Sequence, residues 1–231
     1  MGHKGFLHRI LFIDIETVPL VADYDRLKAK EQELFERKTR YQRKEAFTVP
    51  EFYAKAGIWA EFGKIICIST AYLKSNLKEP KMVLKSFYGD NEKQLLSSFK
   101  EFLKVQFNTK TDLLCAHNGK EFDFPYLARR MIINQIALPE ILNVMGKKPW
   151  EIRHLDTMEL WKFGDYKHYT SLELLTYVLG INSPKENISG KDIARIYYKE
   201  SGMDQIVNYC EKDTIAVAKV YFRMLGFDLD I

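Results

Sequence analysis

Residues 11–19 of this chain read LFIDIETVP, an apolar run that ends in two carboxylates, Asp14 and Glu16. Its β-branched and aromatic residues predict a strand over Ile10 to Ile15, closed by the threonine and proline that follow. Because alternate residues of a strand share a face, the two carboxylates project together, while the neighbouring isoleucines face the core. Adjacent carboxylates repel each other unless a cation lies between them. The stretch therefore predicts either a cation site or an ordinary surface strand end.

A second segment, CAHNGKEFDFPYLARR at residues 115–130, places another acid beside an apolar run. Asp123 falls in the first turn of a helix predicted from about Phe122 to Asn134. The helix dipole favours an anion at that position, although aspartates in a first turn are also common as caps. Asp123 is thus a second candidate for the same acidic site.

The third segment, NYCEKDTIAVAKVY at residues 208–221, lies in a helix predicted from about Met203 to Leu225. Tyr209 and Asp213 are four positions apart, so they share one helix face about a turn from each other. This spacing is frequent in ordinary helices. It is the occurrence of the three segments together, in this order, that indicates a functional site.

Strands and helices alternate between these segments. The pattern predicts strands at Lys64–Leu73, Lys81–Tyr88 and Asp112–Ala116, and a helix at Glu92–Val105. Such alternation predicts an α/β protein, a sheet with flanking helices.

The C-terminal part is predicted to be largely helical. Thr170 and Glu173 have the spacing of a capping box, which predicts a helix start, and Gly180 predicts the end of that helix. A further helix is expected to end at Gly202.

The segment YDRLKAKEQELFERKTRYQRKEAF, residues 24–47, combines helical spacing with dense mixed charge. It predicts a solvated helical insertion, at about residues 20–62, packed against one side of the core. The alternative, a basic clamp on nucleic acid, is less favoured because acids and bases are interleaved. Without repeats or linkers, residues 1–231 are expected to form a single domain that carries this insertion.

Composition limits the class of protein. With 231 residues, 46% of them hydrophobic, the chain can form one compact domain, and a formal charge of +4 permits a polyanionic partner or simple surface balance. Three cysteines without metal-ligand spacing predict reduced thiols. The first apolar run breaks at Asp14, short of signal-peptide length, and no window approaches the roughly 18 apolar residues of a membrane span. We expect a cytoplasmic protein with no membrane partner.

Taken together, DIET closing the first strand, Asn118 followed by FD at residues 122–123, and YCEKD in the last helix form a recognisable set. With these motifs the chain resembles the DEDD superfamily of 3′–5′ exonucleases, in its tyrosine subclass. It is similar to stand-alone bacterial proteins related to the proofreading exonuclease domain of family B DNA polymerases. The resemblance runs from Leu11 to about Tyr221 and includes LDTMELWKFGDYKHYTSLELL at residues 155–175. The histidine subclass would carry histidine where this chain has Asn208.

This resemblance implies a ribonuclease H-like mixed β-sheet with flanking helices and two divalent cations as cofactors. Asp14, Glu16 and Asp213 would ligate one cation, with Asp14 bridging to a second that Asp123 supports. An all-oxygen ligand set favours Mg²⁺ or Mn²⁺. Tyr209 completes the catalytic set, and since a phenol has a pKa of about 10 it is expected to orient the attacking water rather than act as a base.

Four residues are candidates for binding the substrate. Thr17 and Asn118 lie beside expected ligands and are suited to hydrogen-bond a terminal nucleotide, although turn or capping roles explain them equally well. Lys167 and His168 precede the capped helix and are candidates for phosphate contacts or stacking, against a plain surface loop. Of the adjacent pair Arg129–Arg130, at most one is expected to reach backbone phosphates, because neighbours on a helix point about 100° apart.

The sequence thus predicts a two-metal-ion 3′–5′ exonuclease that releases nucleoside monophosphates from single-stranded DNA or RNA 3′ ends, with DNA favoured. One alternative is a catalytically silent ribonuclease H-like module that binds nucleic acid, which loss of a carboxylate would favour. All four carboxylates are present. A second alternative is internal cleavage of a nucleic acid, against which the Tyr209 and Asp213 arrangement argues. The sequence specifies no protein partner.

Overall fold

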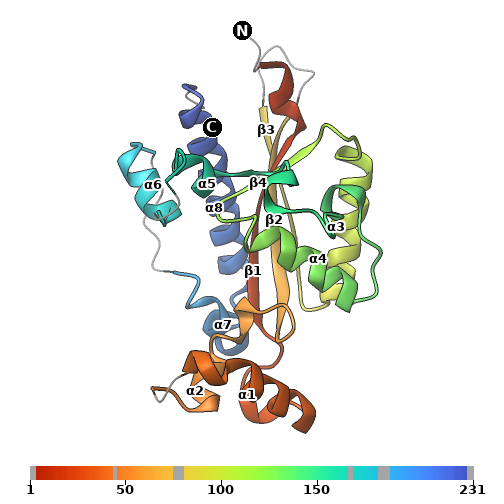
Figure 1. Cartoon of the computed structure of the whole chain (residues 1–231), viewed down its shortest axis with the longest axis vertical. Helices are drawn as coiled ribbons and strands as arrows, with labels where there is room; N and C mark the ends of the chain where they lie inside the picture. Colours follow the sequence, from red (N-terminus) through yellow and green to blue (C-terminus); the bar gives the residue numbers. More distant parts are fainter. Residues whose placement is uncertain (1–3, 44–45, 75–80, 166–168, 182–187, 228–231) are drawn as a thin grey trace.

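The computed structural model describes residues 4–43, 46–74, 81–165, 169–181 and 188–227. Within these residues the chain forms a five-stranded sheet in the order β3-β2-β1-β4-β5 (Figure 1). Strands β1 and β2 are antiparallel, as are β2 and β3, whereas β1 runs parallel to β4 and β4 parallel to β5. The strands are β1 Ile10–Pro19, β2 Gly63–Lys74, β3 Lys81–Tyr88, β4 Leu113–Ala116 and β5 Leu155–Asp156.

Strand β1 is the central strand and has both of its faces buried. Leu11, Ile13 and Ile15 pack on one face, while Ile10 and Phe12 pack on the other. Asp14 and Glu16 follow Phe12 in the same alternation and therefore lie on its face. The pairing with β2 shifts register between Glu16 and Thr17, a bulge directly after the second carboxylate. Bulges of this kind redirect the side chains beside them, and they are common next to active sites.

Helices cover the two faces of the sheet. Helix α8, Met203–Met224, lies along the face that carries Phe12, and its Val217, Ala218 and Phe222 pack there. Helices α3, Glu92–Gln106, and α4, Asp123–Ile133, lie on the opposite side (Figure 1). Their buried residues join Leu11, Ile13 and Ile15 in the largest apolar cluster. The carboxylate-bearing face of β1 therefore faces α8.

Outside residues 20–62, the remaining helices are short. They are η1 Lys4–Arg9, η4 Glu140–Leu142, η5 Pro149–Glu151, α5 Thr157–Trp161, α6 Leu172–Val178, α7 Ile193–Arg195 and the π-helical η6 Ile196–Glu200. The predicted capping box at Thr170 and Glu173 is wrong by one residue. Ser171 caps α6 by accepting a hydrogen bond from the Leu174 N–H, while the Thr170 carbonyl accepts from His117 and stays outside the helix. Gly180 does follow the helix with a positive φ of 63°.

Two other differences concern the C-terminal half. Strand β5 was not predicted, because a strand of two residues has no periodicity to detect. The helix expected to end at Gly202 already ends at Glu200, since Ser201 adopts the left-handed conformation with φ of 52°. The longer elements agree with their predicted ranges to within about four residues, and they confirm the predicted α/β architecture.

Residues 20–62, the predicted insertion, lie between β1 and β2 at the lower end of Figure 1. It comprises η2 Tyr24–Arg26, α1 Ala29–Arg43, α2 Val49–Tyr53 and η3 Ala56–Ile58. Leu20 N–H donates to the Phe62 carbonyl at 2.9 Å, which closes the base of the insertion. Only Phe35 and Thr39 of α1 are buried, and Phe35, which is 0% exposed, is the centre of an apolar cluster within residues 20–62.

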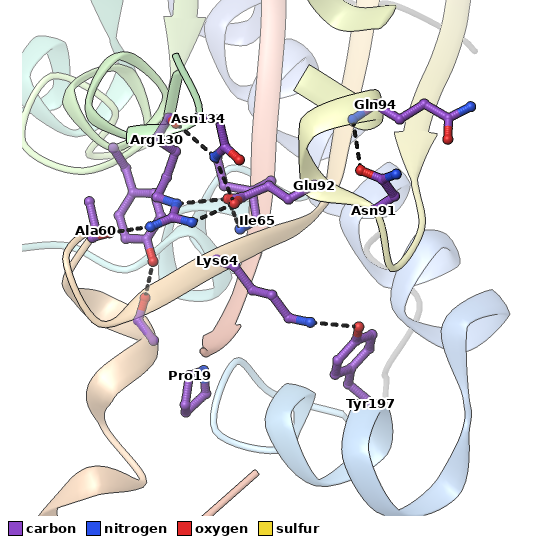
Figure 2. Close-up of polar contacts among 12 residues, drawn as sticks. Pro19, Ala60, Lys64, Ile65, Asn91, Glu92, Gln94, Arg130, Asn134 and Tyr197 are labelled. Carbon is purple, nitrogen blue, oxygen red and sulfur yellow. Dashed lines mark hydrogen bonds and ion pairs between the residues drawn. The ribbon is translucent and has the colours of Figure 1, made fainter. Parts of the chain in front are cut away.

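A buried ion pair joins this insertion to the core (Figure 2). Arg130 of α4 donates from Nε to Glu92 Oε1 of α3 at 2.8 Å, and from Nη1 to the Ala60 carbonyl of the insertion at 2.7 Å. Glu92 also accepts from the Ile65 N–H on β2 and from Asn134. Arg130 is therefore occupied within the protein, which leaves its exposed neighbour Arg129 as the arginine able to reach phosphates.

The mixed five-stranded sheet with helices on both faces is a ribonuclease H-like α/β fold, as predicted. None of the helices in the described part of the chain has the length and apolar character needed to cross a membrane.

Candidate active site

Asp14 and Glu16 lie at the centre of the candidate site, on the face of β1 that meets α8. Within the described residues, one carboxylate oxygen of each and the Cys210 sulfur of α8 all lie within 4.8 Å of one another. Asp14 is half-buried and Glu16 is 7% exposed. Two acids are thus held close together in a poorly solvated position, where their charges repel.

Burial and mutual repulsion govern the electrostatics of these two acids. Desolvation raises the pKa of Asp14 well above its ordinary value, and the charges of Glu16, Asp123 and Asp213 raise it further. The pKa of Glu16 is raised well above its ordinary value in the same way, by desolvation first and then by Asp213. The four predicted carboxylates therefore act on one another electrostatically, although they come from β1, α4 and α8.

Asp123 reaches this group from the start of α4. Its side chain is 4% exposed, and burial raises its pKa to about 7, an effect that a hydrogen bond from the Ile15 backbone partly offsets. This bond ties the first turn of α4 to the strand that carries Asp14 and Glu16. The predicted first-turn position of Asp123 is confirmed, since α4 begins at this residue.

Tyr209 and Asp213 lie one turn apart on α8 and approach β1 together. The pKa of Tyr209 is raised by burial and then by the charges of Asp213, Glu16 and Asp14, and its side chain hydrogen-bonds Asp213. The phenol therefore stays protonated at neutral pH and is a hydrogen-bond donor. It is poorly suited to act as a general base.

The donor set fits a hard divalent cation. Carboxylate oxygens converge where, without a positive charge, their repulsion opposes ionisation, and Mg²⁺ or Mn²⁺ prefers oxygen ligands. Cys210 is not a fitting ligand, because metals bind the thiolate and burial raises the pKa of this thiol well above its ordinary value. Its Sγ–H instead donates to the Asp14 carbonyl at 3.4 Å, which fastens α8 to β1.

Two of the predicted substrate-binding residues lie beside this group. Thr17 follows the bulge in β1, and its side chain hydrogen-bonds the Tyr126 hydroxyl, which donates to the Gly57 carbonyl at 2.7 Å. Asn118 lies in the loop between β4 and α4 and has a left-handed backbone with φ of 61°. The other two candidates, Lys167 and His168, fall outside the described residues.

A hollow of about 250 Å³ opens beside Asn118. Its lining includes three lysines, Lys120, Lys147 and Lys162, of which Lys120 is paired with Glu159 at 2.5 Å. The lining also includes Asp156, which lies in the LDTMELW segment but was not among the predicted site residues. An aspartate followed by TMELW was the available signal, since aspartate is a preferred N-cap residue.

An acidic cluster on a ribonuclease H-like sheet is typical of nucleases. Comparison with known families identifies the family. Residues 58–229 match the family described as "Predicted 3'-5' exonuclease related to the exonuclease domain of PolB", and the chain belongs to that family. The matched range contains Asp123, Tyr209 and Asp213, whereas Asp14 and Glu16 precede it. The predicted resemblance to the exonuclease domain of family B polymerases is thereby confirmed.

Individual relatives are more distant. The chain is 28% identical over 149 residues to the DNA polymerase of Desulfurococcus sp. (strain Tok) and to that of Thermococcus gorgonarius. It is 27% identical over 141 residues to the DNA polymerase of Pyrococcus glycovorans. The first two alignments cover 58% of this chain, and the third covers 54%. Each spans only 18% of the relative's own length.

Proposed function

We propose that the protein is a two-metal-ion 3′–5′ exonuclease that hydrolyses single-stranded nucleic acid to nucleoside monophosphates, and that residues 1–231 act as one exonuclease domain. The observation that carries this proposal is the convergence of Asp14 and Glu16, whose carboxylate oxygens lie within 4.8 Å of each other and of the Cys210 sulfur on α8. Asp123 of α4 and Asp213 of α8 act electrostatically on both of these acids. A module that only binds nucleic acid, without hydrolysing it, would not require four mutually repelling carboxylates in one site. Membership of an exonuclease family supports the proposal.

Each acid has a proposed role. Asp14, Glu16 and Asp213 would hold one divalent cation, and Asp14 and Asp123 would hold a second. When bound, the two ions supply the charge that activates a water and stabilises the leaving 3′ oxygen. The protein contributes a rigid scaffold for the acids, because β1 is central in the sheet and Cys210 and Asp123 both bond to its backbone.

Tyr209 is proposed to orient the attacking water. Its protonated hydroxyl is held by Asp213, one of the proposed ligands, and is therefore fixed relative to the acids. A phenol that keeps its proton can position a water but cannot remove a proton from it at neutral pH.

We further propose that the substrate is a single-stranded 3′ end, with DNA favoured over RNA. The relatives are named DNA polymerases, which supports DNA as the substrate. A duplex end would have to unpair before its last phosphodiester bond reached Asp14, at a cost of a few kcal/mol. Thr17 and Asn118 are proposed to contact the terminal nucleotide from the two sides of the acidic group.

One time course tests the proposal. A 5′-labelled DNA strand, an RNA of the same sequence and a closed DNA circle are incubated with Mg²⁺, with Mn²⁺ and with a chelator. We expect stepwise shortening of the linear DNA, slower shortening of the RNA, an intact circle and no reaction with the chelator. Cutting of the circle at a comparable rate would reassign the protein as an endonuclease, and faster RNA loss would reverse the proposed preference.

A further inference from the structure

Asp156 is a buried aspartate that the proposed reaction does not yet use. It ends β5, at the edge of the sheet, and is 3% exposed. Among the described residues, four backbone N–H groups donate to its carboxylate. A buried carboxylate needs this kind of compensation, because an ionised group without partners is very costly away from water.

The four donors come from two different segments. Oδ1 accepts from Met158 at 3.0 Å and from Glu159 at 3.3 Å, which caps the start of α5. Across the sheet edge, Oδ1 also accepts from Asn118 at 2.9 Å, and Oδ2 accepts from Lys120 at 3.1 Å. One side chain thereby fastens the turn after β4 to the start of α5.

A second connection runs in parallel through His117. Its Nδ1 lies 2.9 Å from the Thr157 hydroxyl, and its Nε2 donates to the Thr170 carbonyl at 2.9 Å. Thr157 is 0% exposed and adjoins Asp156. The turn from His117 to Lys120 is therefore held on both of its sides by the segment that follows β5.

The held turn contains an atom that lacks a partner. The Asn118 side-chain Oδ1 is buried and accepts no hydrogen bond from any described residue. A buried acceptor is seldom left unpaired, and a left-handed non-glycine backbone adds strain, so together they point to function. The same turn leads directly into α4 and Asp123.

We propose that Asp156 is a positioning residue for substrate binding: it holds the Asn118–Lys120 turn so that the unpaired Asn118 amide oxygen is presented to a hydrogen-bond donor on the terminal nucleotide. This inference rests on the proposed exonuclease function. Asp156 acts through Asn118, so the loss of this contact is measured in substrate binding. The charge of Asp156 also raises the pKa of Asp123, and Asn118→Ala leaves that charge in place.

The kinetic test uses Asp156→Asn, Asn118→Ala and the double variant on a 5′-labelled single-stranded DNA. Losing the bond from Asn118 to the nucleotide should raise KM roughly 10-fold in each single variant. In Asn118→Ala, which keeps the charge of Asp156 near Asp123, kcat should stay within about threefold of wild type. The double variant should resemble either single variant, because both changes remove one interaction. KM effects that multiply in the double variant, or an Asp156→Asn KM within twofold of wild type, would overturn the proposal.

Asp112→Asn is the matched control. Asp112 is also buried, at 7% exposed, and accepts a backbone N–H from Thr109 at 2.8 Å, but it precedes β4 at the end away from Asn118. Its substitution should leave KM within about twofold of wild type. A KM increase equal to that of Asp156→Asn would show a general effect of lost buried carboxylates and would contradict a specific positioning role.

Hydrogen exchange of a peptide spanning residues 116–122 gives a readout independent of nuclease activity. Asp156→Asn should accelerate exchange there, and unchanged exchange would overturn the positioning role even if the wild-type protein cleaved nothing and the proposed function had failed. Thr157→Val, which removes the hydroxyl that contacts His117 Nδ1 and donates to the Ala116 carbonyl at 3.4 Å, serves if Asp156→Asn does not fold. This variant should likewise accelerate exchange and raise KM relative to wild type. No change in either quantity would contradict the proposal.

Discussion

Arg130 of α4 donates from Nε to Glu92 Oε1 of α3 at 2.8 Å, and the two side chains are only 6% and 8% exposed. The same arginine donates to the Ala60 carbonyl, so this ion pair is also where residues 20–62 meet the core. Breaking a buried pair on one side leaves an uncompensated charge, which costs far more than the intact pair contributes.

Arg130→Met is therefore expected to lower the free energy of unfolding by about 3–5 kcal/mol. Urea denaturation measures this change. Arg129→Met is the control on the adjacent, exposed residue and should stay within about 0.5 kcal/mol of wild type. The double variant Glu92→Gln with Arg130→Met should recover part of the loss, since it removes both charges. A loss below about 1 kcal/mol in Arg130→Met would contradict the structural role.

Asp14→Ala is expected to reduce the rate of hydrolysis by about three orders of magnitude or more, because it removes a ligand that both proposed cations share. The fold should persist, since the change relieves repulsion among the acids in the cation-free protein. Turnover is measured on a single-stranded oligonucleotide with Mg²⁺, and folding by circular dichroism. Retention of more than about a tenth of wild-type turnover would remove Asp14 from the proposed ligands.

Tyr209→Phe keeps the ring but deletes the hydroxyl that hydrogen-bonds Asp213. We expect kcat to fall roughly 10- to 1000-fold with little change in KM, because a water-positioning group acts on the hydrolytic step. Tyr221→Phe is a control on the same helix, at a tyrosine that packs against Phe12 on the core side. Full activity of Tyr209→Phe would move the water-positioning role to another residue.

His154 makes stability depend on pH. Its Nδ1 accepts from the Leu114 N–H at 3.2 Å while Nε2 donates to the Ile141 carbonyl at 2.9 Å, and burial lowers its pKa to about 4. The unfolded chain binds this proton at about pH 6.5. Stability is therefore complete above that pH and is lost as the pH falls towards 4, by up to about 3 kcal/mol.

The measurement for His154 is a difference between two proteins. Asp123, with a pKa raised to about 7, acts with the opposite sign, because its ionisation destabilises the cation-free fold as the pH rises from about 4 to 7. Subtracting the unfolding free energies of His154→Gln from those of wild type, from pH 4.5 to 7.5, cancels this contribution. A difference that does not vary with pH would show that His154 is not a buried neutral group.

The sequence by itself was sufficient to predict the α/β class and most of the longer elements. Strand β1, the helices α3, α4 and α8, and the face shared by Asp14 and Glu16 all follow from local periodicity. Their buried faces are long enough for the period of two or of 3.6 residues to be evident. The candidate carboxylates and Tyr209 were read from motif order, and their roles remain predictions for the experiments above.

Tertiary structure alone decided the partners of the buried charges. Arg130 and Glu92 are 38 positions apart, as are Asn118 and Asp156, and no local pattern specifies either pairing. The same holds for strand β5, which pairs with β4, and for the Thr170 carbonyl before α6, which accepts from His117, 53 positions away. Periodicity reports which residues are buried, whereas the partner of a buried polar group depends on which segments the fold brings together.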